Sequence, residues 1–265
     1  MNILVLTKYS LDVTEVKVDA ASHELRLSGV PEKIGNIDKN AVEAAVRLRE
    51  SAGGTIKALC LGPIVARENF KDVLAMGVDE VVLVEDPFNG QADGRTAAKI
   101  LETAVKKMGA WDLILCGFAS DDGYSYQTGP RLAERLGLPL VSYARQISVD
   151  GATLQADRDL DDMLQTVSVT LPAVVSVAEE AFPPRRTTLM DALKAKKKPV
   201  NVWSVEGDLG LALDALNSAS FVVSADQTGI VVHRKQQIFK GLPAAEIADR
   251  VIDQLVQDNV FKGGA

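Results

Sequence analysis

Short, uninterrupted apolar runs recur along the first two-thirds of the chain. They lie at Ile3–Leu6, Ile56–Leu61, Val81–Val84 and Leu113–Cys116. A strand shows such a run when both of its faces are covered, as in a parallel sheet. The pattern therefore predicts buried, mostly parallel strands.

Amphipathic segments separate these runs, and each of them ends at glycine. Their apolar positions recur at helical spacing and predict helices over 38–51, 66–76, 94–108 and 128–136. Strands and helices that alternate in this way form a parallel sheet with helices on both faces. We therefore expect an α/β fold.

The pattern changes after about residue 140. Asp150-Gly151 lies between two alternating runs and predicts a hairpin, and further strands are expected at 166–170 and 174–177. These strands would add antiparallel members to the sheet. Phe182–Arg186 holds two prolines and predicts a loop, which a helix over 189–198 follows.

The C-terminal part has weaker periodicity. Residues 201–229 indicate an extended arm with short elements, and 243–258 predict an amphipathic helix with Pro243 near its first turn. We therefore expect an α/β domain over 1–200 and a C-terminal arm and helix over 201–265.

Charge and composition exclude several classes of function. The 265 residues include 29 basic and 36 acidic side chains, so the formal net charge is −7. This balance argues against nucleic acid or an anionic membrane as the main partner. Cys60 and Cys116 lie inside apolar runs and are expected to be reduced and buried. No signal peptide or membrane-inserting segment is recognised, which favours a cytoplasmic protein.

Catalytic and metal-binding motifs are lacking. The two histidines, His23 and His233, lie in unrelated polar surroundings, and neither of the common glycine-rich phosphate motifs follows an expected strand. We therefore assign no catalytic residue and no metal ligand.

The segment Gly117–Pro130 is the strongest candidate for a binding loop. It follows a buried strand and leads into a helix, where ligands of parallel sheets bind and where free N–H groups attract anions. Thr128 is a natural N-cap, and Gly123 and Gly129 permit close approach of the backbone. Tyr124 and Tyr126 could flank a flat ring. A polar loop that only caps its helix is equally compatible with these residues.

A second loop, Asp86–Thr96, reaches the same edge of the sheet after another strand. An ordinary surface loop is again the alternative. The basic run Lys194–Lys198 is typical of a solvated helix end.

Several segments, in this order, resemble the β subunit of electron transfer flavoproteins. They are ILVLTK (3–8), DKNAVEAAVRLRESAGG (38–54), LGP (61–63), VLAMGVDEVVLV (73–84), WDLILCGFASDD (111–122), QTGPRLAERLGLP (127–139), LPAVVSV (171–177) and PRRTTLMDALKAKKK (184–198). The resemblance implies a Rossmann-like domain that binds an adenine nucleotide and pairs with an α subunit, which carries an electron-transferring FAD. It also implies a loop that docks onto a flavin-dependent dehydrogenase, such as an acyl-CoA or lactate dehydrogenase.

The resemblance also implies particular residues. The nucleotide would contact Leu6, Lys8, Asn36, Asp38, Leu61, Asp122, Gly123, Tyr124, Ser125, Tyr126, Gln127, Thr128 and Gly129. Docking would use Pro184, Arg185, Arg186 and Leu189, with Leu189 as the apolar anchor. The alternative is that Leu189 starts the following helix and packs on its own subunit.

Members of this family are of two kinds. In one, the β subunit holds a structural AMP; in the other it holds a second FAD and bifurcates electrons from NADH toward ferredoxin and a higher-potential acceptor. The loop DPFNGQADGRTAA, with Asp93 and Thr96, resembles the bifurcating kind and favours FAD over AMP.

Two other classes of protein are alternatives. A stand-alone adenylate-forming enzyme would need a phosphate loop such as S-G-G-x-D-S after the first strand, where this chain reads TKYSLDVT. An ATP-binding signalling module would need a G-x-x-G run before its last helix, and that run is absent.

Overall fold

The computed structural model describes residues 1–88, 90, 92–160, 162–217 and 235–260. The chain divides into two compact units. The larger consists of Met1–Lys17 and Arg26–Asp226, and the smaller of Val18–Leu25 and Gln227–Ala265. The larger unit holds the sheet, the candidate cavity and the loop before α5.

A nine-stranded sheet forms the centre of the larger unit, in the order β11-β10-β9-β12-β8-β1-β6-β7-β13. Its strands are β1 (Asn2–Thr7), β6 (Thr55–Gly62), β7 (Glu80–Glu85), β8 (Leu113–Gly117), β9 (Leu140–Asp150), β10 (Thr153–Leu160), β11 (Met163–Thr170), β12 (Ala173–Val177) and β13 (Val200–Trp203). In this order, all neighbouring strands from β9 to β13 pair in parallel. At the other end of the sheet, β10 pairs antiparallel with both β9 and β11. The expected α/β fold is confirmed.

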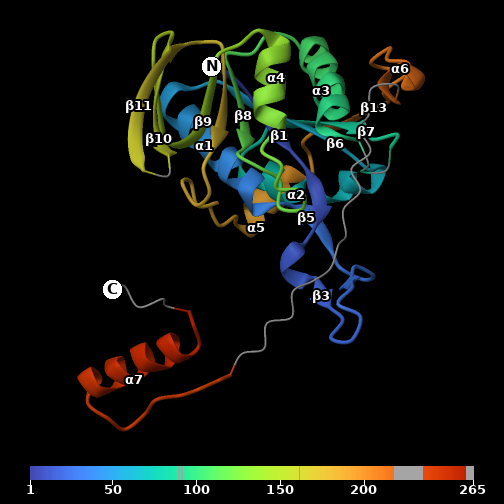
Figure 1. The fold of residues 1–265 in the computed structure, drawn as a ribbon. Coiled ribbons are helices and arrows are strands. Elements are labelled where there is room, and N and C mark those ends of the chain that lie inside the picture. Colours follow the sequence, from blue (N-terminus) through green and yellow to red (C-terminus); the bar gives the residue numbers. More distant parts are fainter. Residues whose placement is uncertain (89, 91, 161, 218–234, 261–265) are drawn as a thin grey trace. The chain divides into compact units, whose positions relative to one another are not determined.

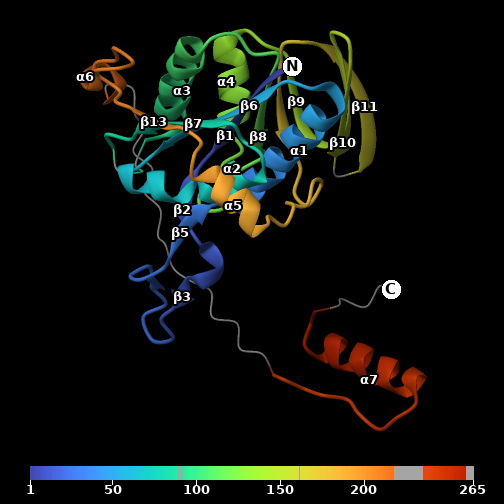
Figure 2. The same ribbon diagram turned by 180° about the vertical axis from the view of Figure 1, so that it is seen from behind.

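Helices cover both faces of this sheet (Figures 1 and 2). On one face, Ile3 and Val5 of β1 pack in a core with α1 (Asn36–Ala52) and α2 (Lys71–Met76). On the other face, Leu4 and Leu6 pack in a second core with α3 (Gly94–Met108) and α4 (Thr128–Leu136). The strand alternates between two apolar cores, which explains why its sequence is apolar without interruption.

The predicted helices are found, with one interruption. The segment expected as a single helix over 66–76 divides at Phe70 into a 3₁₀ helix (Ile64–Asn69) and α2. Phe70 is fully buried between the two pieces. Helix α5 (Leu189–Ala195) is shorter than expected. Lys198, the last residue of the basic run, instead donates from Nζ to the carbonyl oxygens of Leu74 at 2.8 Å and Val78 at 2.6 Å. It thereby supplies donors at the C-terminal end of α2.

The sheet continues past the expected domain boundary at residue 200. Strand β13 pairs with β7 from Val200↔Val81 to Trp203↔Val84. Helix α6 (Leu213–Asn217) follows in the same unit. At the other edge, the hairpin predicted at Asp150-Gly151 joins β9 to β10.

The remaining elements are small or belong to the smaller unit. Pairs β2 (Tyr9–Leu11) with β5 (Glu32–Ile34) and β3 (Lys17–Val18) with β4 (Leu25–Arg26) form two-stranded sheets, and a 3₁₀ turn covers Val13–Glu15. Helix α7 (Ala244–Gln257) begins after Pro243, as predicted, and buries none of its own residues. No described helix is both long enough and apolar enough to cross a lipid bilayer.

Candidate functional site

A cavity of about 300 Å³ lies at the carboxyl ends of β1, β6, β7 and β8. The strand order changes direction here, because β1 is followed along the chain by β6 on one side and much later by β8 on the other. Ligands of open α/β sheets bind at such a point. Nine of the residues implied by the family resemblance line this cavity: Leu6, Lys8, Asp38, Leu61, Gly123, Ser125, Tyr126, Gln127 and Thr128.

Helix α4 points its N-terminus at the cavity. Its first residue is Thr128, as the predicted range 128–136 has it, and its N-cap is Gln127, one position before the cap expected at Thr128. The Gln127 side chain makes no capping bond; its Oε1 accepts a hydrogen bond from Arg131 Nε at 2.9 Å. The first N–H groups of α4 therefore have no cap from the N-cap side chain, and they suit an anion.

Helix α3 starts differently. The Asp93 carboxylate caps it by accepting a hydrogen bond from the Thr96 backbone N–H at 2.7 Å. Thr96 is buried, and its hydroxyl donates to the Leu216 carbonyl at 3.5 Å. Asp93 and Thr96 thus serve the start of the helix, whereas Gly94 lines the cavity. A Cβ on Gly94 would lie 2.6 Å from Gln127 Oε1, so the starts of α3 and α4 are close together.

Gly129 lies on the sheet side of α4 and does not line the cavity. It is buried, and a Cβ there would lie 2.9 Å from Cys116 Sγ. The missing side chain lets the helix pack closely on β8. Cys116 itself is a buried free thiol, and burial raises its pKa to about 12.

Asp38 and Lys8 provide the charged groups of the cavity floor. Asp38 Oδ2 accepts the Lys8 backbone N–H at 2.7 Å, and Lys8 Nζ pairs with Asp122 at 2.8 Å. Burial raises the pKa of Asp38 to about 7; Asp121 and Asp122 add to the rise, and Lys8 opposes it. Burial also acts to raise the pKa of Asp122, but the bonds to Lys8 outweigh it and the pKa is lowered.

Asn36 lies outside the cavity, at the start of α1. Its backbone N–H donates to Asp121 Oδ2 at 3.0 Å, and it lines a neighbouring depression together with Tyr124. Asp121 thereby supplies the cap that Gly35, the N-cap residue, lacks.

An aromatic cluster stands beside the cavity. The Phe118 ring lies 5.5 Å from Tyr124, 5.6 Å from Tyr126 and 5.8 Å from Tyr143. All three tyrosines have left-handed backbone, with φ of 45°, 59° and 58°, which is uncommon for large side chains and is concentrated at functional sites. Tyr126 and Phe118 line the cavity, whereas Tyr124 packs edge-on to Tyr126 and donates to Glu179 Oε2 at 3.3 Å. The two tyrosines expected to flank a ring are therefore not parallel to one another.

Sequence reasoning missed several residues of the cavity wall. Thr7 lines it, and its hydroxyl is buried with no hydrogen-bond partner of normal geometry among the described residues. Asp86 also lines it and accepts hydrogen bonds from the N–H groups of Phe88 at 2.9 Å and Gly90 at 2.7 Å. Asp86 directly follows β7 and begins the loop Asp86–Thr96, which the sequence placed at this edge without assigning Asp86 to the site. Thr7 follows the apolar run Ile3–Leu6, and nothing in this sequence context indicated that it lines a cavity.

The predicted docking residues differ in exposure. Leu189 begins α5, as the alternative expected, yet 78% of it is exposed. Pro184 and Arg186 are also exposed, whereas the Arg185 side chain is turned toward α1. Thr188 and Asp191 form a reciprocal cap at the start of α5.

A model of the electron transfer flavoprotein domain matches residues 25–208. The chain belongs to the electron transfer flavoprotein family. It is 36% identical over 207 residues to the electron transfer flavoprotein subunit beta of Thermoanaerobacterium thermosaccharolyticum, covering 78% of this chain and 79% of the relative. It is 32% identical over 260 residues to the subunit beta of Clostridium acetobutylicum, covering 98% and 99%.

A third relative is named as part of a larger assembly. The caffeyl-CoA reductase-Etf complex subunit CarD of Acetobacterium woodii is 32% identical over 270 residues, which cover 98% of this chain and 100% of the relative. The family relationship predicted from the sequence is thus confirmed, and the chain is an electron transfer flavoprotein β-type subunit.

Proposed function

We propose that this electron transfer flavoprotein subunit binds an adenine nucleotide, preferably FAD, in the cavity at the carboxyl ends of β1, β6, β7 and β8. The observation that carries this proposal is the Thr7 hydroxyl, which is buried in the cavity wall beside Cys60 and has no hydrogen bond of normal geometry among the described residues. A buried hydroxyl of this kind costs free energy unless a ligand oxygen or nitrogen satisfies it. The start of α4, with its free N–H groups, lies in the same wall and fits a phosphate.

The residues present fit a nucleotide in the following way. The N–H groups at the start of α4, where Thr128 lines the cavity, would hold a phosphate, and Asp38 and Lys8 would face polar groups of the ligand. Phe118 and Tyr126 offer aromatic surface to a flat ring. A bound flavin supplies one- and two-electron chemistry, while the protein supplies position and electrostatics.

FAD is favoured over AMP, and bifurcation is favoured with it. The support is the loop from Asp86 to Thr96, whose sequence resembles the bifurcating kind and whose first residue lines the cavity. The relative named for the caffeyl-CoA reductase-Etf complex gives further support. In this proposal electrons pass from NADH through the flavins to ferredoxin and to a partner dehydrogenase.

The proposed partners are an α subunit and a flavin-dependent dehydrogenase that oxidises an acyl-CoA, lactate or a similar substrate. Helix α7 presents Val251, Ile252 and Val256 to solvent, and such an apolar face suits the α subunit. Leu189, with Pro184 and Arg186 beside it, would contact the dehydrogenase. Cytoplasmic location is part of the same proposal.

The test is to purify the chain with its α subunit, denature the complex and identify the released nucleotides. Two FAD per heterodimer would support the second flavin. One FAD with one AMP would retain the nucleotide site and refute bifurcation. A complex that releases only the FAD of the α subunit would refute the nucleotide site itself.

A further inference from the structure

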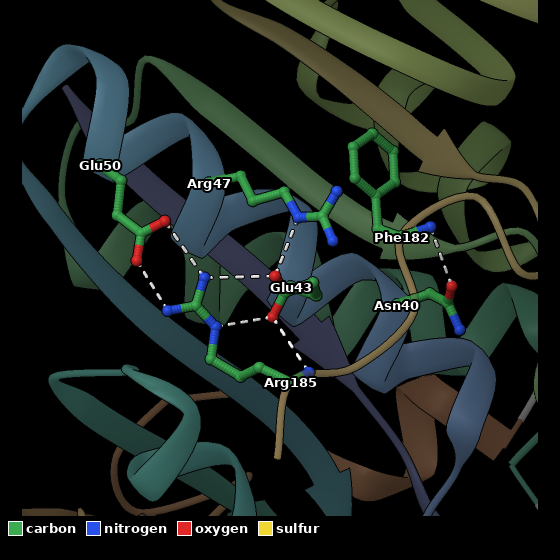
Figure 3. A network of polar contacts seen from close by, with 6 residues as sticks. All are labelled: Asn40, Glu43, Arg47, Glu50, Phe182 and Arg185. Carbon is green, nitrogen blue, oxygen red and sulfur yellow. Dashed lines mark hydrogen bonds and ion pairs between the residues drawn. The ribbon is translucent and has the colours of Figure 1, made fainter. Parts of the chain in front are cut away.

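The loop between β12 and α5 is fastened to helix α1 by an arginine fork (Figure 3). Arg185 Nε lies 2.8 Å from Glu43 Oε2, and Arg185 Nη1 lies 2.6 Å from Glu50 Oε1. Arg185 Nη2 joins both carboxylates, at 3.2 Å to Glu43 and 3.1 Å to Glu50. A planar guanidinium shared by two carboxylates fixes direction as well as distance.

Glu43 is the inner part of this fork and is only 2% exposed. It also accepts the Arg185 backbone N–H at 3.3 Å and Arg47 Nε at 2.9 Å. Burial acts to raise the pKa of Glu43, but hydrogen bonds from Arg185 and Arg47 outweigh it and lower the pKa. The carboxylate is therefore ionised at neutral pH and holds both the side chain and the backbone of Arg185.

A second contact holds the loop three residues earlier. The Phe182 backbone N–H donates to Asn40 Oδ1 at 3.1 Å, and the Arg47 guanidinium lies 5.7 Å from the centre of the Phe182 ring. Asn40, Glu43, Arg47 and Glu50 follow one another at helical spacing along α1. These residues lie on one side of α1, and their contacts hold residues 182–185 against the helix.

Helix α5, which follows this fixed segment, presents an apolar face to solvent. Leu189, Met190 and Leu193 of α5 are 78%, 60% and 46% exposed. Arg186 follows the fork directly and makes no ion pair within the described part of the chain. Adjacent arginines therefore have different environments: one is turned inward to α1 and the other outward.

We propose that Arg185 is a positioning residue, which through Glu43 and Glu50 orients the apolar face of α5 for docking and does not itself touch the partner. This inference rests on the proposed docking role of Leu189. It assigns to Arg185 a different task from the one that the family resemblance implied. A loop held in its bound orientation loses less entropy when it meets a partner.

The experiment compares Arg185→Gln, Arg185→Lys and Glu50→Gln, each in the complex with the α subunit, and Arg186→Gln is the matched control for the exchange measurement alone. Hydrogen–deuterium exchange is measured for residues 182–188. Electron transfer is titrated with an acyl-CoA dehydrogenase from which the parent complex accepts electrons.

We expect Arg185→Gln to raise exchange in residues 182–188 by about tenfold and the half-saturating dehydrogenase concentration by a similar factor, with the rate at saturation near the parent's. Arg185→Lys, which retains charge without the fork, should fall between Gln and the parent. Glu50→Gln weakens only the contact of Arg185 with the more exposed carboxylate, so exchange and half-saturation should rise by smaller factors. Arg186→Gln should leave exchange at the parental level.

Two results would overturn the proposal. Parental exchange in Arg185→Gln and Glu50→Gln would show that the fork does not hold the loop, and faster exchange with unchanged half-saturation would show that its order does not serve docking. A parental titration for Leu189→Ala would instead refute the docking role itself, while the exchange data would still report on the fork.

Discussion

The backbone N–H of Lys8 donates a 2.7 Å hydrogen bond to Oδ2 of Asp38, and this bond joins the end of the central strand to the first turn of α1. The carboxyl group accepts this bond whether or not it carries a proton on its other oxygen. Its charge is therefore free to change at the floor of the cavity without the loss of the contact.

This arrangement predicts how the stability of the protein depends on pH. Burial raises the pKa of Asp38 from 3.8 to about 7. Between these values the unfolded chain has released the proton and the folded chain retains it, so the contribution of Asp38 makes stability fall as pH rises from about 4 to about 7. Asp38→Asn keeps an acceptor for the Lys8 N–H and removes this dependence.

Urea unfolding of the parent and of Asp38→Asn from pH 4.5 to 8 measures the difference. The free energy of unfolding of the variant relative to the parent should increase up to about pH 7 and then stay level. Glu102, whose pKa is lowered to about 2 by Lys106, Arg135 and Lys99 against its burial, acts at lower pH and is common to both proteins. A constant difference across the range would contradict the prediction.

A second prediction concerns Thr7→Val. The Thr7 hydroxyl is buried and has no hydrogen bond of normal geometry among the described residues. Replacing it with a methyl group of similar size should leave the nucleotide-free protein equally stable or more stable by up to about 1 kcal/mol. If the nucleotide satisfies the hydroxyl, the same variant should bind it more weakly by roughly fivefold to tenfold. Thermal unfolding without ligand and calorimetric titration with FAD and AMP separate the two effects. Unchanged affinity for both nucleotides would remove Thr7 from the site.

The parts of the fold that could be predicted are those that depend on local sequence patterns, such as apolar runs and glycines at helix ends. Apolar runs such as Ile3–Leu6 identified buried strands because each residue meets one of two cores. Helix ends were marked by glycines, as at Gly137, which adopts left-handed backbone. The short strand Val200–Trp203 was missed because it lies at a sheet edge and depends on its pairing with β7, a distant segment of the chain, for example Val200 with Val81.

The site was predictable only to the level of its loops. The position of the cavity followed from strand ends, and Thr128 and Gln127 line its wall. The side-chain partners could not be predicted, because they join segments that are distant in the sequence. Asp121 caps α1, and the Phe118 ring contacts Tyr143 on a strand that follows α4. Gly129 was expected to let the backbone approach an anion closely, but it is buried against β8, where a Cβ would lie 2.9 Å from Cys116 Sγ.

The packing of Gly129 gives a third prediction. Gly129→Ala places a methyl group where Cys116 Sγ lies 2.9 Å away, and it should lower the melting temperature by roughly 3–10 °C through overpacking. Gly123→Ala is the matched control, since its Cβ would meet only Ser120 Oγ at 3.4 Å.

The double variant Gly129→Ala with Cys116→Ala tests the cause. Removing the sulfur makes room for the new methyl group, so the double variant should be more stable than the sum of the two single changes. Additive losses of melting temperature would show that the strain at Gly129 has another origin.

The exposed leucine gives a fourth prediction. Leu189 is 78% exposed, so Leu189→Ala should change the melting temperature little. Loss of a leucine that enters a partner's apolar pocket costs roughly 1.5–3 kcal/mol, which corresponds to a tenfold or greater rise in the dissociation constant. Stopped-flow measurement of electron transfer at increasing concentrations of the partner dehydrogenase gives this change in the dissociation constant.

A second exposed leucine serves as the control for this measurement. Leu164 lies on β11 and is 69% exposed, so Leu164→Ala removes the same atoms at a different surface. Equal losses of transfer in both variants would mean that the effect is not specific to α5.

The place of β1 in the sheet has a consequence for how the protein is made. β1 is synthesised first, yet its neighbours are β6, where Ile3 pairs with Ile56, and β8, where Ile3 pairs with Leu113. At roughly 5–20 residues per second, a ribosome needs on the order of 5–20 seconds to reach the second neighbour. During that interval a strand with the apolar run Ile3–Leu6 has an open edge, so nascent chains that stop before Leu113 should depend on chaperones or aggregate.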